Sequence, residues 1–153
     1  MMKLCSEVLE ALSGKTLVTA ESLTGGGIGA ALTAVPGSSA VYKGGIISYT
    51  NWVKETVLGV SRETLETHGA VSLQTAEEMA VGVRKLLHSD VAVSVTGLAG
   101  PGGDEYGNPV GTVCIGFCNG WESFAVRCHF EGDREAVRRQ TIRPALELVF
   151  HNA

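Results

Sequence analysis

The sequence predicts an α/β fold, a three-layer α/β/α sandwich with a mixed β-sheet, formed by a single domain over residues 1–153. Apolar segments with the length of strands alternate with segments that repeat apolar residues at helical spacing, which is typical of such folds. The segment DVAVSVTG (90–97) is almost continuously apolar, as expected for a strand whose two faces are both covered. Late in the chain, the dipeptide Asn119-Gly120 indicates a hairpin, which makes the predicted sheet mixed.

The first part of the chain is predicted to form two helices and two strands. Apolar residues recur at helical spacing over 4–12, and Gly14 suits the position just after a helix end. KTLVTA (15–20) is expected to be a short buried strand. A glycine-rich stretch then opens a second helix, which stops before Pro36, and VYKGGIISY (41–49) is expected to be the second strand.

Three helical segments are predicted next, at 51–58, 62–66 and 72–90. The last of them is the clearest, because Ser72 suits an N-cap and one face is apolar. The residues of that apolar stripe are Ala76, Met79, Ala80, Val83, Leu86 and Leu87.

A long loop (97–110) is expected to follow the strand at 90–97. GTVCIGFC (111–118) and WESFAVRCHF (121–130) are expected to form the two strands of the hairpin. The final helix should begin after Asp133. Its predicted inward-facing residues are Val137, Ile142, Leu146 and Val149.

Composition and charge exclude several classes of protein. Apolar residues make up 44% and charged residues 18% of the chain, as in globular domains. The net charge of -4 argues against a nucleic-acid-binding protein, which usually carries a basic face. Glu7 and Glu10 interrupt any signal-peptide core, and no apolar run is long enough to span a bilayer. We therefore expect a cytoplasmic protein that binds neither nucleic acid nor a membrane; a homo-oligomer is compatible with the sequence.

The cysteines and histidines show no metal-binding spacing. Neither Cys-x-x-Cys nor His-x-x-x-His occurs among the four cysteines and four histidines. Three of the cysteines lie in predicted strands, where a thiol usually serves as a small buried apolar group. We expect no metal site, no disulfide and no cofactor.

The glycine-rich stretch TAESLTGGGIGAALTAVPGSS (19–39) is the most informative part of the sequence. A phosphate-binding P-loop would need a lysine after the glycines, and a dinucleotide-binding turn would need an acidic residue about 20 positions further on. Neither is present, since residues 31–54 contain no Asp or Glu. What remains is a helix N-terminus rich in free backbone N–H groups, which favours either a phosphate or a developing oxyanion.

Ser22 and Thr24 precede this helix, and two interpretations are open. Both hydroxyls could cap the helix, or Ser22 could be a nucleophile. The Gly-x-Ser-x-Gly elbow is absent and no histidine lies in a recognisable partner motif, so a lysine would have to serve as the base. Lys54 lies in an apolar run and could do so; alternatively, it is a solvated lysine paired with Glu55.

Four longer motifs occur along the chain in a fixed order. They are TAESLTGG, VPGSSAVYKGGIISYTNWVKETVLGV, VTGLAGPGG with PVGTVCIGF, and FEGDREAVRRQT, and they span nearly the whole chain. Together they resemble the CinA C-terminal domain family, whose members are often labelled competence/damage-inducible proteins. The activity characterised in that family is the deamidation of nicotinamide mononucleotide to nicotinate mononucleotide and ammonia.

The resemblance implies a serine/lysine amidohydrolase acting on a small nucleotide. It assigns the nucleophile to Ser22, the base to Lys54 and a supporting role to Tyr49, and backbone N–H groups near 24–26 are expected to hold the oxyanion. For the two arginines among the substrate-binding candidates, a solvated basic helix face is an equally good interpretation. The candidates for binding the substrate are Thr24, Gly25, Gly26, Ser39, Thr96, Gly97, Gly100, Gly102, Gly103, Arg134 and Arg138.

Position 23 departs from the family pattern, which usually has Cys after the serine where this chain has Leu23. The change leaves Ser22 and Lys54 in place but bears on the shape of the pocket. Two other hypotheses remain beside the amidohydrolase: a non-catalytic nucleotide-binding module in which the glycines hold phosphate, and a regulatory interaction protein. Release of ammonia would separate the first hypothesis from the other two.

Overall fold

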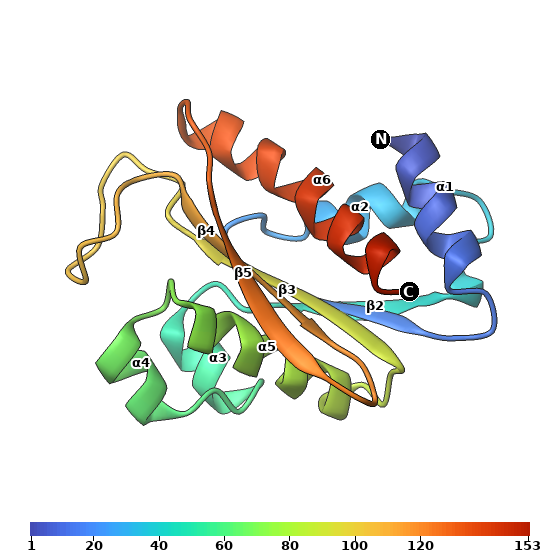
Figure 1. The fold of residues 1–153 in the computed structure, drawn as a ribbon, viewed down its shortest axis with the longest axis horizontal. Coiled ribbons are helices and arrows are strands. Elements are labelled where there is room, and N and C mark those ends of the chain that lie inside the picture. Colours follow the sequence, from blue (N-terminus) through green and yellow to red (C-terminus); the bar gives the residue numbers. More distant parts are fainter.

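The five strands of the sheet lie in the order β2-β1-β3-β4-β5, between two layers of helices (Figure 1). The structure is a computed structural model that describes residues 1–153. β2, β1 and β3 run parallel, whereas β4 and β5 are antiparallel to their neighbours, so the predicted mixed sheet is confirmed. The strands are β1 (Leu17–Glu21), β2 (Tyr42–Ile47), β3 (Val91–Gly97), β4 (Thr112–Cys118) and β5 (Ser123–His129).

One helical layer consists of α1, α2 and α6, and the other of α3, α4 and α5 (Figure 1). The helices are α1 (Met2–Ala11), α2 (Gly27–Thr33), α3 (Asn51–Thr56), α4 (Arg62–His68), α5 (Leu73–Leu86) and α6 (Arg134–His151). The predicted cap at Ser72 is confirmed, because its side chain accepts a hydrogen bond from the N–H of Thr75. A short 3-10 helix, η1 (Ser38–Ala40), was not predicted.

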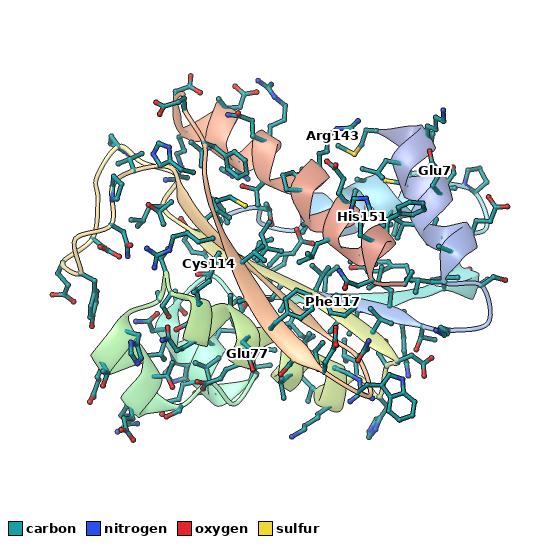
Figure 2. The ribbon with its side chains drawn as sticks, in the orientation of Figure 1. Glu7, Glu77, Cys114, Phe117, Arg143 and His151 are labelled. Atoms are coloured by element: carbon teal, nitrogen blue, oxygen red, sulfur yellow. The ribbon has the colours of Figure 1, made fainter.

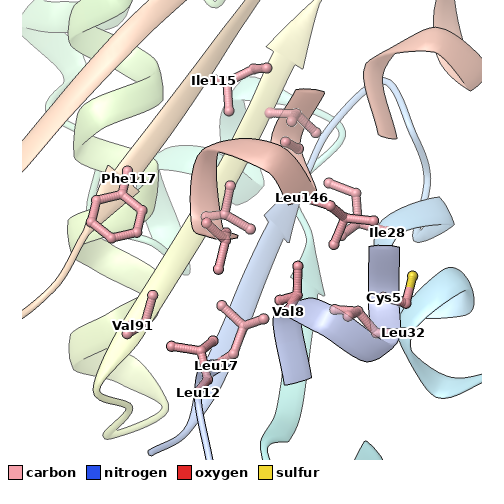
Figure 3. Close-up of a cluster of buried hydrophobic side chains, with 14 of the residues drawn as sticks. Cys5, Val8, Leu12, Leu17, Ile28, Leu32, Val91, Ile115, Phe117 and Leu146 are labelled. Carbon is pink, nitrogen blue, oxygen red and sulfur yellow. The ribbon is translucent and has the colours of Figure 1, made fainter. Parts of the chain in front are cut away.

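The larger hydrophobic core lies between the sheet and the layer of α1, α2 and α6. Figure 3 shows side chains of these helices meeting Leu17 of β1 and Ile115 of β4. Cys5 of α1 is fully buried in this core and acts as a small apolar group. Complete burial of each aliphatic side chain contributes about 1.5–3 kcal/mol, so this layer is firmly attached to the sheet.

A smaller core joins α5 to the opposite face of the sheet. Along β4, Cys114 packs toward α5 and Phe117 toward the other layer, as alternation along a strand requires (Figure 2). A side chain at Gly116 would collide with the backbone carbonyl of Ala76, so glycine allows α5 to approach the sheet closely. Leu86 does not belong to the apolar stripe as predicted; it is 45% exposed because it ends the helix at the surface.

The predicted hairpin between β4 and β5 is confirmed, but its turn is longer than the dipeptide suggested. The side-chain oxygen of Asn119 accepts hydrogen bonds from the N–H groups of Trp121 and Glu122, at 2.8 and 2.9 Å. These bonds close a turn over 119–122, so the strand begins at Ser123 and leaves Trp121 exposed.

The connections of the parallel strands create a crevice at one edge of the sheet. From β1 the chain passes through α2, on one face of the sheet, to β2. From β2 it passes through α3, α4 and α5, on the opposite face, to β3, which lies on the other side of β1. Such a reversal leaves a ligand-sized gap beyond the carboxyl ends of the strands. Ser22 follows β1 there, Ser48 follows β2, and Gly97 ends β3. No helix has the length and apolar character needed to cross a membrane.

Candidate active site

A cavity of about 290 Å³ opens at the carboxyl ends of the parallel strands. This volume is at the lower end of the roughly 300–1,000 Å³ found for small-molecule sites. Of the residues expected from the sequence, those lining the cavity are Ser22, Tyr49, Lys54, Thr96, Gly97, Gly100, Gly102 and Arg134. Leu23, which was expected to bear on the shape of the pocket, also lines it, and the remaining lining residues are Asn51, Ala70, Val71, Leu98 and Ala99.

Ser22 and Lys54 meet in the floor of this cavity. Nζ of Lys54 lies 3.0 Å from Oγ of Ser22, although 32 positions separate the two residues. Only 1% of Lys54 and 6% of Ser22 is exposed. Lys54 reaches the site because α3 begins directly after β2, where the Thr50 hydroxyl caps the helix by accepting from the N–H of Val53.

Burial makes the charged form of Lys54 less favourable than it is in water. Nζ also donates to the carbonyl oxygens of Ser48 and Tyr49, at 2.9 and 3.3 Å, and no carboxylate pairs with it. Burial therefore lowers the pKa of Lys54 from 10.5 to about 8. A neutral amine can donate its two protons to the two carbonyls and turn its lone pair to the Ser22 hydroxyl. The alternative of a solvated lysine paired with Glu55 is wrong, because Glu55 pairs with Arg62.

Glu21, which sequence reasoning missed, caps α2. Its buried carboxylate accepts hydrogen bonds from the N–H groups of Ile28 and Gly29, at 2.7 and 3.0 Å, and from the Thr24 hydroxyl at 2.6 Å. The negative charge that a helix N-terminus favours is thus supplied by the protein itself. Neither Ser22 nor Thr24 caps the helix, and the capping N–H groups are not available to a phosphate.

The backbone directly after Ser22 still offers free donors. The N–H of Gly25 donates to the carbonyl of Ser22 at 3.1 Å. The N–H groups of Leu23, Thr24 and Gly26 have no acceptor within the chain. Free N–H groups at the nucleophile are the usual means of stabilising an oxyanion. The Thr24 side chain does not line the cavity and instead donates its hydroxyl to Glu21; Gly25 and Gly26 are not among the lining residues either.

Arg134 connects two walls of the cavity at its mouth. It is the first residue of α6, and its Nη2 donates to the Tyr49 hydroxyl at 2.8 Å. Its Nη1 donates to the carbonyl of Gly100 at 2.7 Å. Tyr49 itself is 56% exposed. The mouth therefore carries a positive charge beside an accessible phenol, which suits an anionic ligand.

The loop after β3 forms another wall, and side-chain hydrogen bonds tie the end of β3 and the far end of this loop to the segment 66–71. The hydroxyl of Thr96 donates to the carbonyl of Ala70 at 2.8 Å. At the far end of the loop, the Tyr106 hydroxyl donates to the carbonyl of Glu66 at 2.8 Å, and Asn108 Nδ2 donates to that of Val71 at 3.1 Å. The wall is thus shaped before any ligand binds.

Three further residues expected at the site lie outside the cavity. Ser39 lies in η1, just before β2. Because Tyr42 pairs with Leu17, the first residue of β1, this segment lies at the amino ends of the parallel strands, away from the cavity. Gly103 follows the last lining residue of its loop. Arg138 turns its Nε to the carbonyl of Leu23 at 2.8 Å, so it contacts the backbone beside the nucleophile rather than the cavity.

The thiols are poor alternatives to Ser22 as a nucleophile. Cys5, Cys114 and Cys118 are buried, Cys128 is half-buried, and burial raises the pKa of all four thiols. Leu23, where the family usually has Cys, packs its side chain into the larger core. No group of three or more His, Cys, Asp or Glu side chains lies close enough together to hold a metal ion.

Comparisons with known proteins agree on one family. A family model described as the CinA C-terminal domain matches residues 1–153. A CinA-like protein from Parasynechococcus marenigrum is 49% identical over 148 residues, which cover 94% of this chain and 35% of the relative. The chain thus spans about one third of the length of the curated relatives it matches.

Crystal structures of similar proteins share the fold. The competence damage-inducible protein A from Klebsiella pneumoniae has a TM-score of 0.95 and 39% identity, with 98% of this chain and 94% of that chain covered. A competence/damage inducible protein from Agrobacterium tumefaciens has a TM-score of 0.93 and 40% identity, with 98% and 93% covered.

Proposed function

The chain belongs to the CinA C-terminal domain family, and on this basis we propose that it hydrolyses the amide of nicotinamide mononucleotide to nicotinate mononucleotide and ammonia. The observation that carries the proposal is the buried pair of Ser22 and Lys54, joined at 3.0 Å in the floor of a cavity. A serine hydroxyl beside a desolvated amine without a carboxylate partner is the arrangement needed for a serine nucleophile with a lysine base.

In the first step, the neutral amine of Lys54 takes the proton of the Ser22 hydroxyl. Oγ attacks the carbonyl carbon of the nicotinamide amide, and a tetrahedral oxyanion forms. The free N–H groups of Leu23 and Thr24, directly after the nucleophile, are the nearest backbone donors in sequence for this charge. Because they are fixed before the reaction, they stabilise the transition state without reorganisation.

In the second step, Lys54 gives its extra proton to the amide nitrogen, and ammonia leaves. Ser22 then carries the nicotinate group as an ester. Lys54, neutral again, takes a proton from water, whose oxygen attacks the ester carbonyl. As the bond from the carbonyl carbon to Oγ breaks, Lys54 returns this proton to Ser22, and nicotinate mononucleotide leaves. The exposed Tyr49 hydroxyl, held by Arg134, has a supporting role at the mouth.

We also propose how a nucleotide would lie in the cavity. Arg134 carries the only guanidinium lining the cavity, and we assign the substrate phosphate to it. The wall formed by Thr96, Gly97, Gly100 and Gly102 would face the ribose. Ser39, Gly103 and Arg138 are not part of this assignment because they lie outside the cavity.

The alternative of a non-catalytic module that holds phosphate on the glycine turn has less support. Its anion site would need the N–H groups of the first turn of α2, and Glu21 already occupies those of Ile28 and Gly29. Stabilisation of the protein by the nucleotide without any turnover would favour this alternative. Turnover with release of ammonia would favour the hydrolase.

Activity is expected to rise with pH through the pKa of Lys54. Only the neutral amine can take the Ser22 proton, and burial places that pKa at about 8. Below this value kcat/KM should fall about tenfold for each pH unit. The second pKa of the substrate phosphate is about 6, roughly two units below the pKa of Lys54. A profile recorded above pH 7 therefore reports the lysine alone. A flat profile, or a rate that falls as the pH rises, would exclude Lys54 as the base.

A further inference from the structure

The two peptide groups that follow Ser22 are each held by one hydrogen bond to their carbonyl oxygen. The N–H of Gly25 donates to the carbonyl of Ser22 at 3.1 Å. Nε of Arg138 donates to the carbonyl of Leu23 at 2.8 Å, across 115 positions of sequence. No other hydrogen bond to the Leu23 carbonyl is present.

Holding these carbonyls also fixes two N–H groups. A trans peptide group is planar, so its C=O and N–H point in opposite directions. The bond from Gly25 therefore orients the N–H of Leu23, and the bond from Arg138 orients the N–H of Thr24. Neither N–H has an acceptor within the chain. Arg138 belongs to α6, whereas Lys54 belongs to α3 in the other helical layer, so the two side chains reach this turn from different layers.

The local sequence gives the second peptide group no other anchor. The bond from the N–H of Gly25 to the Ser22 carbonyl closes a four-residue turn, and the Leu23–Thr24 peptide group is the central one of that turn, so this bond does not hold it. A side chain added at Gly25 would lie 3.4 Å from Nη2 of Arg138, which shows how closely the guanidinium covers this turn. Without Arg138, the Leu23–Thr24 peptide group could rotate and present its carbonyl to the site.

We propose that Arg138 is a positioning residue for the oxyanion hole, which keeps the N–H of Thr24 turned toward the reacting carbonyl of the substrate. This inference rests on the proposed amide hydrolysis. It differs from a role for Arg138 in binding the substrate phosphate, because its guanidinium contacts the backbone beside the nucleophile and does not line the cavity. An effect on the reaction should therefore appear in the transition state and not in substrate binding.

The test is Arg138→Met, which keeps an unbranched side chain and removes the donor. Loss of one oxyanion donor costs about 10²–10³-fold in kcat, and partial misorientation should cost about 10–10²-fold with KM changed less than about threefold. The pH midpoint near 8 should stay in place, because burial and not a neighbouring charge sets the pKa of Lys54. A higher KM with unchanged kcat would instead assign Arg138 to phosphate binding and overturn the inference.

Arg139→Met is the matched control, since Arg139 is the next residue on α6 and its exposed side chain pairs only with Glu135. It changes the net charge equally and should keep the wild-type kcat. Arg138→Lys keeps the charge but has a methylene group in place of Nε and a single ammonium donor one atom beyond it, and an intermediate kcat is expected. Wild-type kcat in Arg138→Met, or equal losses in both Met variants, would overturn the inference.

A second readout does not depend on turnover. The backbone amide signal of Thr24 in a ¹⁵N–¹H spectrum of the ligand-free protein should shift in Arg138→Met and stay in place in Arg139→Met. An unshifted signal would show that Arg138 does not orient this peptide group. If the wild-type protein fails to deamidate nicotinamide mononucleotide, the proposed function and the catalytic part of the inference are both overturned, while the Thr24 signal still decides the orientation.

Discussion

Ser22→Ala is expected to lower kcat for ammonia release from nicotinamide mononucleotide by about 10⁶-fold, the loss typical of removing a serine nucleophile. Oγ of Ser22 is the only hydroxyl within hydrogen-bond distance of the Lys54 amine. The four thiols lie elsewhere and are kept protonated by burial, so none can replace it. No cysteine lines the cavity.

The variant should remain folded, which makes the loss of activity interpretable. The Ser22 hydroxyl caps no helix, and its one hydrogen bond is to Lys54, so stability should change by only about 1 kcal/mol. Ser39→Ala is a matched control, because Ser39 is exposed in η1 at the amino ends of the parallel strands and should keep the wild-type rate. A folded Ser22→Ala variant with wild-type turnover would remove Ser22 from the mechanism.

Lys54→Met is expected to lose nearly as much activity, because a nucleophile and its base act as one unit. Loss of a general base alone costs about 10²–10⁴-fold, which sets the smallest expected effect on kcat. Lys54→Arg should not restore activity, since arginine stays charged and cannot accept the serine proton. Measured rates for both variants check this, and an active Lys54→Arg enzyme would exclude the lysine as the base.

The same variant gives a readout on stability that is independent of turnover. The pKa of Lys54 is about 8 in the folded protein, below its usual value of 10.5, so the unfolded chain binds more protons between these values. The free energy of unfolding of the wild type should therefore rise with pH across this window, by about 3 kcal/mol relative to Lys54→Met. The difference should be constant below pH 8. A difference that does not change with pH would show that Lys54 is not desolvated.

The layers of the fold could be predicted because each element has its own local signal. The apolar stripe of α5, the continuous apolar run of β3 and the turn at Asn119 are all properties of neighbouring residues. The exceptions are also local. Leu86 fits the helical spacing but lies at the end of α5, where the sheet no longer covers it.

The contact between Ser22 and Lys54 could not be derived from local patterns. It forms because β1 and β2 are parallel neighbours, so the segments after their carboxyl ends meet. The sequence could only suggest it through the resemblance of motifs. Glu21 was missed for a similar reason, because a glutamate at a strand end looks like any exposed polar residue until α2 folds back over it.

The arginines of α6 show the limit of helical periodicity. Arg134 and Arg138 are four residues apart and therefore lie on one face, which suggests a shared role. In the structure, one turn of helix separates their targets: Arg134 reaches the mouth of the cavity and Arg138 reaches the carbonyl of Leu23. Ser39 lies outside the cavity because the direction of β2, which only the sheet fixes, places it at the amino ends of the parallel strands.

The most direct measurement is product analysis after the purified chain is incubated with nicotinamide mononucleotide at about pH 8.5, where most of Lys54 is neutral. The proposed mechanism predicts equal amounts of nicotinate mononucleotide and ammonia from the wild type, and neither from folded Ser22→Ala. Unchanged substrate after prolonged incubation, or free nicotinamide released by cleavage of the bond to ribose, would contradict it.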